Sequence, residues 1–261
     1  MSASSDTVNM ALFCDFENVA LGVRDAKYAK FDINKVLERL LLKGSIVLKK
    51  AYCDWERYKE FKSDMHEASF ELIEIPHVRM SGKNSADIRM VVDALDLCYT
   101  KSHVDTFVII SGDSDFSPLV SKLRENDKTV IGVGVKNSSS DLLVANCDEF
   151  IYYDDLVRQD EQKRRAAKKR REGAPAEDKK QEAFDLVVET LNALIAERGE
   201  GEKIWGSMVK QALKRRNPGF NESYYGFSSF SKLLDEAESR KMLQLERDEK
   251  SGGYIVKSVA H

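Results

Sequence analysis

The stretch FVIISGDSDFSPLV, residues 107–120, decides the fold. Its apolar run, Phe107 to Ile110, stops abruptly at Ser-Gly-Asp-Ser-Asp, and residues suited to a helix follow. A short apolar run bounded by turn residues predicts a buried strand. Strands that are buried on both faces are typical of parallel sheets covered by helices. The stretch therefore predicts an α/β fold in which Asp113 and Asp115 follow the end of a buried strand.

Residues 8–156 repeat this alternation of short apolar strands and helical segments. The expected strands are 10–16, 45–52, 70–76, 106–111, 128–134 and 149–153. Helical spacing of apolar residues is seen between them, first at Ile33, Val36, Leu37, Leu40 and Leu41, and later at Ile88, Val91, Val92, Leu95 and Cys98. Strand–helix alternation predicts a parallel sheet flanked by helices, with right-handed connections.

The remainder of the chain divides into a linker and a second unit. Residues 157–179 are interpreted as a basic charged linker whose first part extends the preceding helix, because from residue 158 on the large aliphatic side chains are absent and Lys and Arg dominate. Residues 180–258 begin with an amphipathic segment and end in two strand-like segments around DEKSGG. Ser207 and either Ser228 or Ser229 are expected to cap helices there. This pattern predicts a small winged-helix domain.

Composition narrows the class of protein. Charged residues make up 33% of the 261 residues and hydrophobic residues 42%, as in globular proteins with an apolar core. No apolar run is long enough to span a bilayer, and the N-terminus lacks the features of a secretory signal, so a cytoplasmic protein without membrane contact is expected. The cysteines Cys14, Cys53, Cys98 and Cys147 are scattered, which predicts reduced thiols and no zinc site.

The formal net charge of −3 conceals an asymmetry along the chain. Residues 1–157 carry a net charge of about −7, residues 158–179 about +4, and the rest about zero. Such a basic segment either binds a polyanion that the acidic body would repel or is a solvated spacer.

Acidic residues follow two of the predicted strands. Asp15 comes at the end of the first, and Asp113 follows the fourth. If these strands are neighbours where the strand order reverses, both carboxylates face one crevice at the carboxyl edge of the sheet. Asp87 lies in the first turn of the intervening helix, where it also suits the helix dipole. Asp93 and Asp96, off the apolar stripe, are expected to be solvated surface charges.

Several carboxylates in one crevice repel one another unless a cation lies among them. Mg²⁺ suits such a place, because it takes a few carboxylate ligands and leaves positions for water and phosphate oxygens. Other phosphate chemistries lack their motifs, since the chain has neither GxGxxG after the first strand nor GxxxxGK[ST]. The DxDx[TV] pattern of phosphatases with an Asp nucleophile is met only in part, because Glu17 replaces the second Asp.

Three motifs together, DFEN at 15–18, KNSAD at 83–87 and SGDSDFSPLV at 111–120, resemble the NYN domain, a branch of the PIN-like nuclease superfamily that includes LabA-like bacterial proteins. The resemblance covers nearly all of residues 8–156. It implies a PIN-like (Rossmannoid) fold and a metal-dependent ribonuclease using Mg²⁺ or Mn²⁺. It also implies metal-site roles for Asp15, Asp87, Asp113 and Asp115, a water- or ligand-orienting role for Asn18, and phosphate contacts for Lys83 and Ser138, the latter as a helix cap.

The second unit, with GSMVKQALKRRNPGF and YGFSSFSKLLDEA, resembles the OST-HTH/LOTUS domain. That resemblance implies RNA binding in some members and protein docking in others. Basic side chains beside an aromatic ring suit phosphate contact and base stacking, and the candidates are Lys210, Lys214, Arg215, Arg216 and Tyr225. The alternative is that the aromatics form core and the basic residues a solvated helix end.

The expected activity is therefore hydrolysis of RNA phosphodiester bonds, as by an endoribonuclease, with the second domain holding RNA or a protein partner. A non-catalytic RNA-binding scaffold and a phosphohydrolase of small substrates are the alternatives, and homodimer formation is left open.

Overall fold

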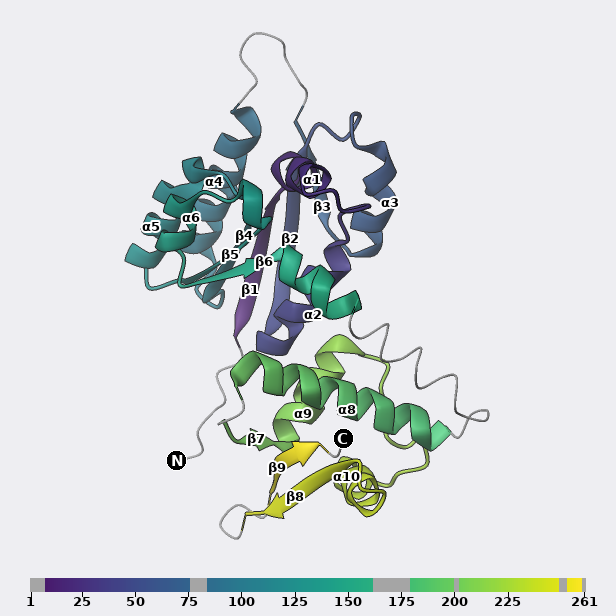
Figure 1. The fold of residues 1–261 in the computed structure, drawn as a ribbon. Helices are drawn as coiled ribbons and strands as arrows, with labels where there is room; N and C mark the ends of the chain where they lie inside the picture. The colour runs from purple at the N-terminus through teal and green to yellow at the C-terminus, as the bar shows by residue number, and fades with distance from the viewer. Residues whose placement is uncertain (1–7, 76–83, 162–178, 200–201, 249–252, 260–261) are drawn as a thin grey trace. The chain divides into compact units, whose positions relative to one another are not determined.

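In the computed structural model (Figure 1), the residues that can be described are 8–75, 84–161, 179–199, 202–248 and 253–259. They belong to two compact units. The first unit carries strands β1 to β6 and the helices between them. The second carries α8 to β9. No described helix combines the length and the apolar character needed to cross a membrane.

The first unit is built on a six-stranded, entirely parallel sheet in the order β3-β2-β1-β4-β5-β6. The strands are β1 (Asn9–Asp15), β2 (Ser45–Cys53), β3 (Glu71–Glu74), β4 (Thr106–Ile110), β5 (Thr129–Gly134) and β6 (Glu149–Tyr152). All six match the predicted strands to within a few residues at their ends. The chain runs outward from β1 on one side and from β4 on the other, so the strand order reverses between these two strands.

Alternate residues of the central strands enter two separate cores. Met10, Leu12 and Cys14 of β1 pack on one face of the sheet, and Ala11 and Phe13 pack on the other. The first core includes apolar residues of α1, α2 and α3, and the second includes residues of α4, α5 and α6. Burial on both faces explains why these strands are apolar throughout.

The helices begin at residues whose chemistry suits a helix terminus. In the first unit they are α1 (Phe16–Asp25), α2 (Ile33–Lys43), α3 (Lys59–Glu67), α4 (Ser85–Thr100), α5 (Ser117–Glu125) and α6 (Asp141–Asn146), with short 3-10 turns η1 (Ser114–Phe116) and η2 (Lys136–Ser138). Side chains of Asp15, Asp32 and Ser140 cap α1, α2 and α6. Residues 153–161 are helical, as predicted for the start of the linker, and the rest of the linker up to residue 178 lies outside the described residues.

The second unit combines helices with a small antiparallel sheet, as predicted for a winged-helix domain. Its elements are α8 (Lys179–Arg198), β7 (Ile204–Trp205), α9 (Gly206–Arg216), α10 (Phe230–Ser239), β8 (Leu243–Arg247) and β9 (Tyr254–Val259), and the sheet order is β7-β9-β8. Ser229 caps α10, as one of the predicted alternatives. The prediction for Ser207 is wrong, because α9 begins at Gly206 and Trp205 precedes it without a side-chain cap.

Candidate active site

The strand order brings Asp15 and the Ser111–Asp115 turn to the same edge of the sheet. Asp15 is the last residue of β1, and its neighbour Cys14 is level with Ile110, the last residue of β4. Both strands end where the strand order reverses, which is where open α/β sheets bind ligands. The expected juxtaposition of the first and fourth strands is therefore present.

Hydrogen bonds join the ends of these two strands. The Ser111 hydroxyl donates to Asp15 Oδ2 at 2.9 Å, and the Asp113 amide donates to Ser111 Oγ at 3.2 Å. From the β1 side, Asn18 Oδ1 accepts the Gly112 amide at 2.9 Å, while the Asn18 amide donates to Asp15 Oδ1 at 3.4 Å. Asn18 thus fixes the turn that carries Asp113, which is a positioning role.

The turn after β4 presents two carboxylates in different environments. Asp113 caps η1, with its Oδ1 accepting the amide of Asp115 at 3.0 Å, and its side chain is partly buried. Asp115 is exposed to solvent. The turn therefore holds the carboxylate of Asp113 in place and leaves that of Asp115 accessible to solvent.

Asp87 completes the acidic cluster, which we define as Asp15, Asp87, Asp113 and Asp115. It lies in the first turn of α4, as predicted, and is partly buried. Burial raises the pKa of Asp87, and the negative charges of Asp113 and Asp115 raise it further. The cluster therefore forms one electrostatic unit.

Asp15 has the most perturbed carboxyl group of the cluster. Its residue is 8% exposed, and burial, followed by the charge of Asp87, raises its pKa from the usual 3.8 to about 7. The Ser111 hydrogen bond opposes this rise, since it stabilises the ionised form. No Lys or Arg in the described ranges lies within ion-pair distance of any of the four carboxylates.

The donor chemistry of the cluster fits a hard divalent cation, because uncompensated carboxylate oxygens are the ligands that Mg²⁺ and Mn²⁺ accept. Within the described part of the chain, no three Asp, Glu, His or Cys side chains are gathered closely enough to hold one ion. Mg²⁺ commonly takes one or two carboxylates and completes its shell with water and substrate phosphate. The side chains fit this sparse mode of binding, which needs no three-carboxylate cage.

The loop after β5 closes against the turn that carries the acids. A Cβ at Gly112 would lie 2.4 Å from the Ser138 carbonyl oxygen, so only glycine fits that approach. The expectation that Ser138 caps a helix is wrong, because Ser140 caps α6 and Ser138 lies in η2, with its hydroxyl donating to the Val135 carbonyl at 3.4 Å. Ser138 itself is exposed.

Two other predictions concern the aspartates further along α4 and Lys83, which precedes α4 in the sequence. Asp93 was expected to be a solvated charge, which is wrong. Its side chain is 12% exposed and accepts hydrogen bonds from the Tyr52 hydroxyl at 2.8 Å and from Lys50 at 3.1 Å, because α4 packs that carboxylate against β2. Asp96 is exposed, as expected. Lys83 lies outside the described residues.

The candidate RNA contacts of the second unit differ from one another in exposure. Lys214 is exposed, whereas the Arg216 side chain is 9% exposed and pairs with Glu189 at 3.0 Å. Lys210 pairs with Glu222 at 2.6 Å. Tyr225 is partly buried, with its ring stacked on Phe220 at 5.4 Å between centroids. Arg215 shares the last turn of α9 with Lys214 and Arg216.

Sequence reasoning missed the part played by Ser111. It is fully buried and joins Asp15 to the Asp113 backbone, yet in the sequence it reads only as the first small residue of a turn. The sequence likewise does not predict that Glu17 forms an ion pair with Arg57 at 3.1 Å. The proximity of Ser111 to Asp15 depends on strand pairing, which no local signal in either motif reveals.

Two known protein families match the sequence of this chain. The sequence model of the NYN domain matches residues 9–154, which is more than half of the chain. The chain belongs to the NYN domain family. The NYN domain has a PIN-like, nuclease-like fold, in agreement with the six-stranded parallel sheet. Residues 184–255 match the OST-HTH/LOTUS domain, a class that is associated with RNA binding.

Similar proteins add no named activity. A crystal structure of a protein of unknown function from Vibrio parahaemolyticus is 26% identical and superposes with a TM-score of 0.52, covering 59% of this chain and 98% of that one. An uncharacterized protein of Methanocaldococcus jannaschii is 27% identical over 117 residues, which are 45% of each chain. The match thus spans less than half the length of that relative.

Proposed function

We propose that this NYN domain protein is a metal-dependent ribonuclease whose active site is the acidic cluster, with the OST-HTH/LOTUS unit holding RNA. The observation that carries the proposal is that Asp15 ends β1 and Asp113 lies in the turn that follows the adjacent strand β4, with Asp87 coupled to both electrostatically. A buried carboxylate whose pKa is raised to about 7, beside like charges, is typical of a functional site in a cleft.

The residues of the acidic cluster have different roles in the proposed hydrolysis. One or two of the carboxylates of Asp15, Asp87 and Asp113 would hold Mg²⁺ or Mn²⁺, which when bound would neutralise the carboxylates, activate a water and stabilise charge on the phosphate. Asp115, the exposed member, accepts a hydrogen bond from the attacking water and orients it. The new bond joins the water oxygen to phosphorus while that water gives up a proton to solvent, the phosphodiester P–O bond breaks, and the leaving oxygen takes a proton from solvent.

The remaining residues of the site hold the carboxylates in place. Asn18 ties α1 to the Gly112 amide, and Ser111 ties the Asp15 carboxylate to the Asp113 backbone. These bonds restrict the rotation of Asp15 and Asp113, and a fixed geometry of this kind lowers the cost of reaching the transition state.

Asp113→Asn tests the assignment. The substitution removes one negative charge while keeping the side-chain oxygen that caps η1, so the fold should survive. We expect cleavage of single-stranded RNA in Mg²⁺ or Mn²⁺ to fall by roughly 1,000-fold, equivalent to about 4 kcal/mol. Asp141→Asn is the matched control, because Asp141 is an exposed aspartate in the first turn of α6.

Cleavage should be measured with purified full-length protein, with Mg²⁺, Mn²⁺ or a chelator, and with a DNA strand of the same sequence. Full activity of Asp113→Asn would refute the assignment of the acidic cluster. RNA binding by the wild type without cleavage in either metal would instead identify a non-catalytic RNA-binding scaffold.

A further inference from the structure

A pocket lies in the first unit, on the α1 side of the sheet. It has a volume of about 410 Å³ and is lined in part by residues of α1, of the segment between α1 and α2, and of the segment from 57 to 61. This volume is within the range of small-ligand sites. The basic residues that line the pocket are Arg24, Lys30 and Arg57. Its aromatic lining residues include Tyr28, Tyr58 and Phe61. Glu60 is the single acidic residue among its lining residues.

Tyr58 and Phe61, which we call the aromatic wall of the pocket, both pack against Phe16. This residue is fully buried and follows Asp15 directly. Its ring centroid lies 5.0 Å from that of Phe61 and 5.7 Å from that of Tyr58, both in edge-to-face geometry. Phe61 and Tyr58 are partly exposed. Because the buried ring supports them, these two side chains present aromatic surface to the pocket in a defined place.

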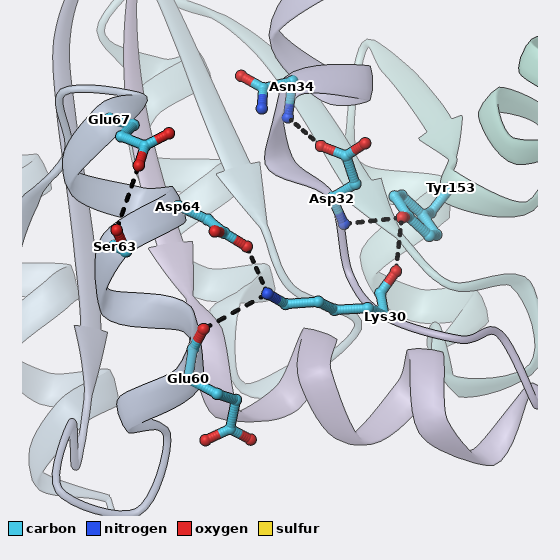
Figure 2. Close-up of polar contacts among 8 residues, drawn as sticks. All are labelled: Lys30, Asp32, Asn34, Glu60, Ser63, Asp64, Glu67 and Tyr153. Carbon is cyan, nitrogen blue, oxygen red and sulfur yellow. Dashed lines mark hydrogen bonds and ion pairs between the residues drawn. The ribbon is translucent and has the colours of Figure 1, made fainter.

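Both the backbone and the side chain of Lys30 form polar contacts that hold this residue in place (Figure 2). Its carbonyl accepts a hydrogen bond from the Tyr153 hydroxyl at 3.4 Å, and the same hydroxyl accepts the Asp32 amide at 2.9 Å. Its Nζ lies 2.6 Å from Asp64. The same nitrogen lies 5.0 Å from the centroid of the Phe61 ring. The Lys30 ammonium group is therefore held beside the Phe61 ring.

Each basic side chain of the pocket has a protein carboxylate as a partner, but the pairs are exposed. Arg24, which is 72% exposed, pairs with Asp25. Lys30, which is 45% exposed, pairs with Asp64, and Arg57, which is 50% exposed, pairs with Glu17. Ion pairs with this exposure contribute little to stability, so a phosphate can exchange for the carboxylate at small cost. Arg in particular can contact phosphate with two parallel hydrogen bonds.

The pocket adjoins the carboxyl edge of the sheet that carries the acidic cluster. Arg57 Nη1 lies 3.1 Å from Glu17 Oε1, and Glu17 is two residues beyond Asp15. The pocket is lined by residues of α1, which begins directly after Asp15, whereas Asp113 lies in the turn after β4, the neighbour of β1. An RNA strand whose phosphate reaches the acidic cluster is repelled there by the carboxylates, and positive charge next to that site offsets the repulsion.

We propose that this pocket binds one nucleotide of a single-stranded RNA next to the bond that is cut. The base lies against Tyr58 and Phe61, and its phosphate contacts Arg24, Lys30 and Arg57. Bases in a duplex are stacked and paired, so the pocket selects unpaired RNA. The inference rests on the proposed ribonuclease function. A free nucleoside monophosphate has the same chemistry, and the experiment separates it from a strand.

The decisive variant is Arg24→Ala/Lys30→Ala. It removes two basic side chains of the pocket, and neither of them pairs with a residue of the acidic cluster or with Glu17. The matched control is Lys62→Ala/Arg124→Ala, which also removes one Lys and one Arg that are in exposed ion pairs outside the pocket lining. Phe61→Leu tests the aromatic wall while retaining an apolar side chain.

Binding is measured on the full chain in chelator by fluorescence anisotropy of a short labelled single-stranded RNA, at several salt concentrations. We expect about tenfold weaker binding for Arg24→Ala/Lys30→Ala and for Phe61→Leu, and less than about twofold for the control. The salt dependence should fall by about 1.4 in log–log slope for the pocket variant. The thermal midpoint of each variant shows that it is folded. In cleavage assays, KM should rise for the pocket variant while kcat is retained.

Equal affinities of the pocket variant and its control would overturn the inference, as would equal loss for duplex and single-stranded RNA. Binding of AMP as tight as that of the strand, and lost in the pocket variant, would also overturn it, because the site would then serve a free nucleotide. Absence of cleavage by the wild type would remove the nuclease proposal, whereas the binding comparison in chelator would still decide whether the pocket holds RNA.

Discussion

The Ser111 hydroxyl donates a 2.9 Å hydrogen bond to the carboxylate of Asp15, a residue 96 positions earlier in the chain. Ser111 is fully buried and Asp15 is 8% exposed, so the bond is shielded from water. It joins the ends of the two strands between which the order of the sheet reverses. Because the same hydroxyl accepts the Asp113 amide, Ser111 connects two of the proposed catalytic carboxylates.

Ser111→Ala should change the titration of the site as well as its stability. The hydrogen bond from Ser111 lowers the pKa of Asp15, so its loss raises that pKa above about 7. Cleavage needs the ionised carboxylate, and the rising limb of the pH–rate profile should therefore move to higher pH. We expect a stability loss of about 1–2 kcal/mol, measured by chemical denaturation. Ser117→Ala is the control, since the buried Ser117 hydroxyl has no hydrogen-bond partner among the described residues. An unshifted profile would contradict the assigned role.

Asp15 should make the metal-free protein less stable as pH rises. Its folded-state pKa of about 7 exceeds the usual 3.8, so the native state holds a proton that the unfolded chain releases. The stabilising effect is complete below about pH 4 and is lost as pH rises through 7, by a few kcal/mol. Asp15→Asn removes this titration. The difference in unfolding free energy between variant and wild type, measured in chelator from pH 4 to 8, should grow in favour of the variant. A constant difference would show that Asp15 titrates normally.

Divalent cations should raise the thermal midpoint of the wild type. Binding to the folded state alone stabilises it by about 1.4 kcal/mol when the free ion is near ten times its Kd. The gain should be larger at pH 8 than at pH 6, because protons compete for Asp15 below its pKa of about 7. Calorimetry with Mg²⁺ or Mn²⁺ measures the shift. Asp113→Asn should show a smaller one, and an equal shift in that variant would place the ion elsewhere.

Lys214→Ala and Arg216→Ala should affect different properties of the protein, although the two residues are in the same helical turn. The Arg216 side chain is 9% exposed and pairs with Glu189, so its removal should lower stability by about 1–3 kcal/mol. Lys214 is exposed, and its removal should leave stability unchanged and weaken RNA binding, with a smaller salt dependence. Denaturation and RNA titration of both variants test this. A loss of RNA affinity confined to Arg216→Ala would reverse the assignment.

The sequence by itself determined the strands of the first unit and the residue types of its acidic cluster. Fully apolar runs such as Phe107 to Ile110 can be buried on both faces only in a covered parallel sheet, and the acids that follow must then lie at its carboxyl edge. The cap residue was less predictable. Ser138, Ser139 and Ser140 are chemically alike, and only the path of the backbone selects Ser140 as the cap of α6.

Only the tertiary structure decided which residues meet. Asp93 looked like a surface charge because its neighbours along α4 leave it off the apolar stripe, and packing against β2 buried it beneath Tyr52 and Lys50. The contacts of Ser111 with Asp15 and of Arg57 with Glu17 likewise join separate motifs. Local propensity acts over a few residues, whereas these contacts are set by strand order and by the packing of helices on the sheet, so no stretch of sequence contains them.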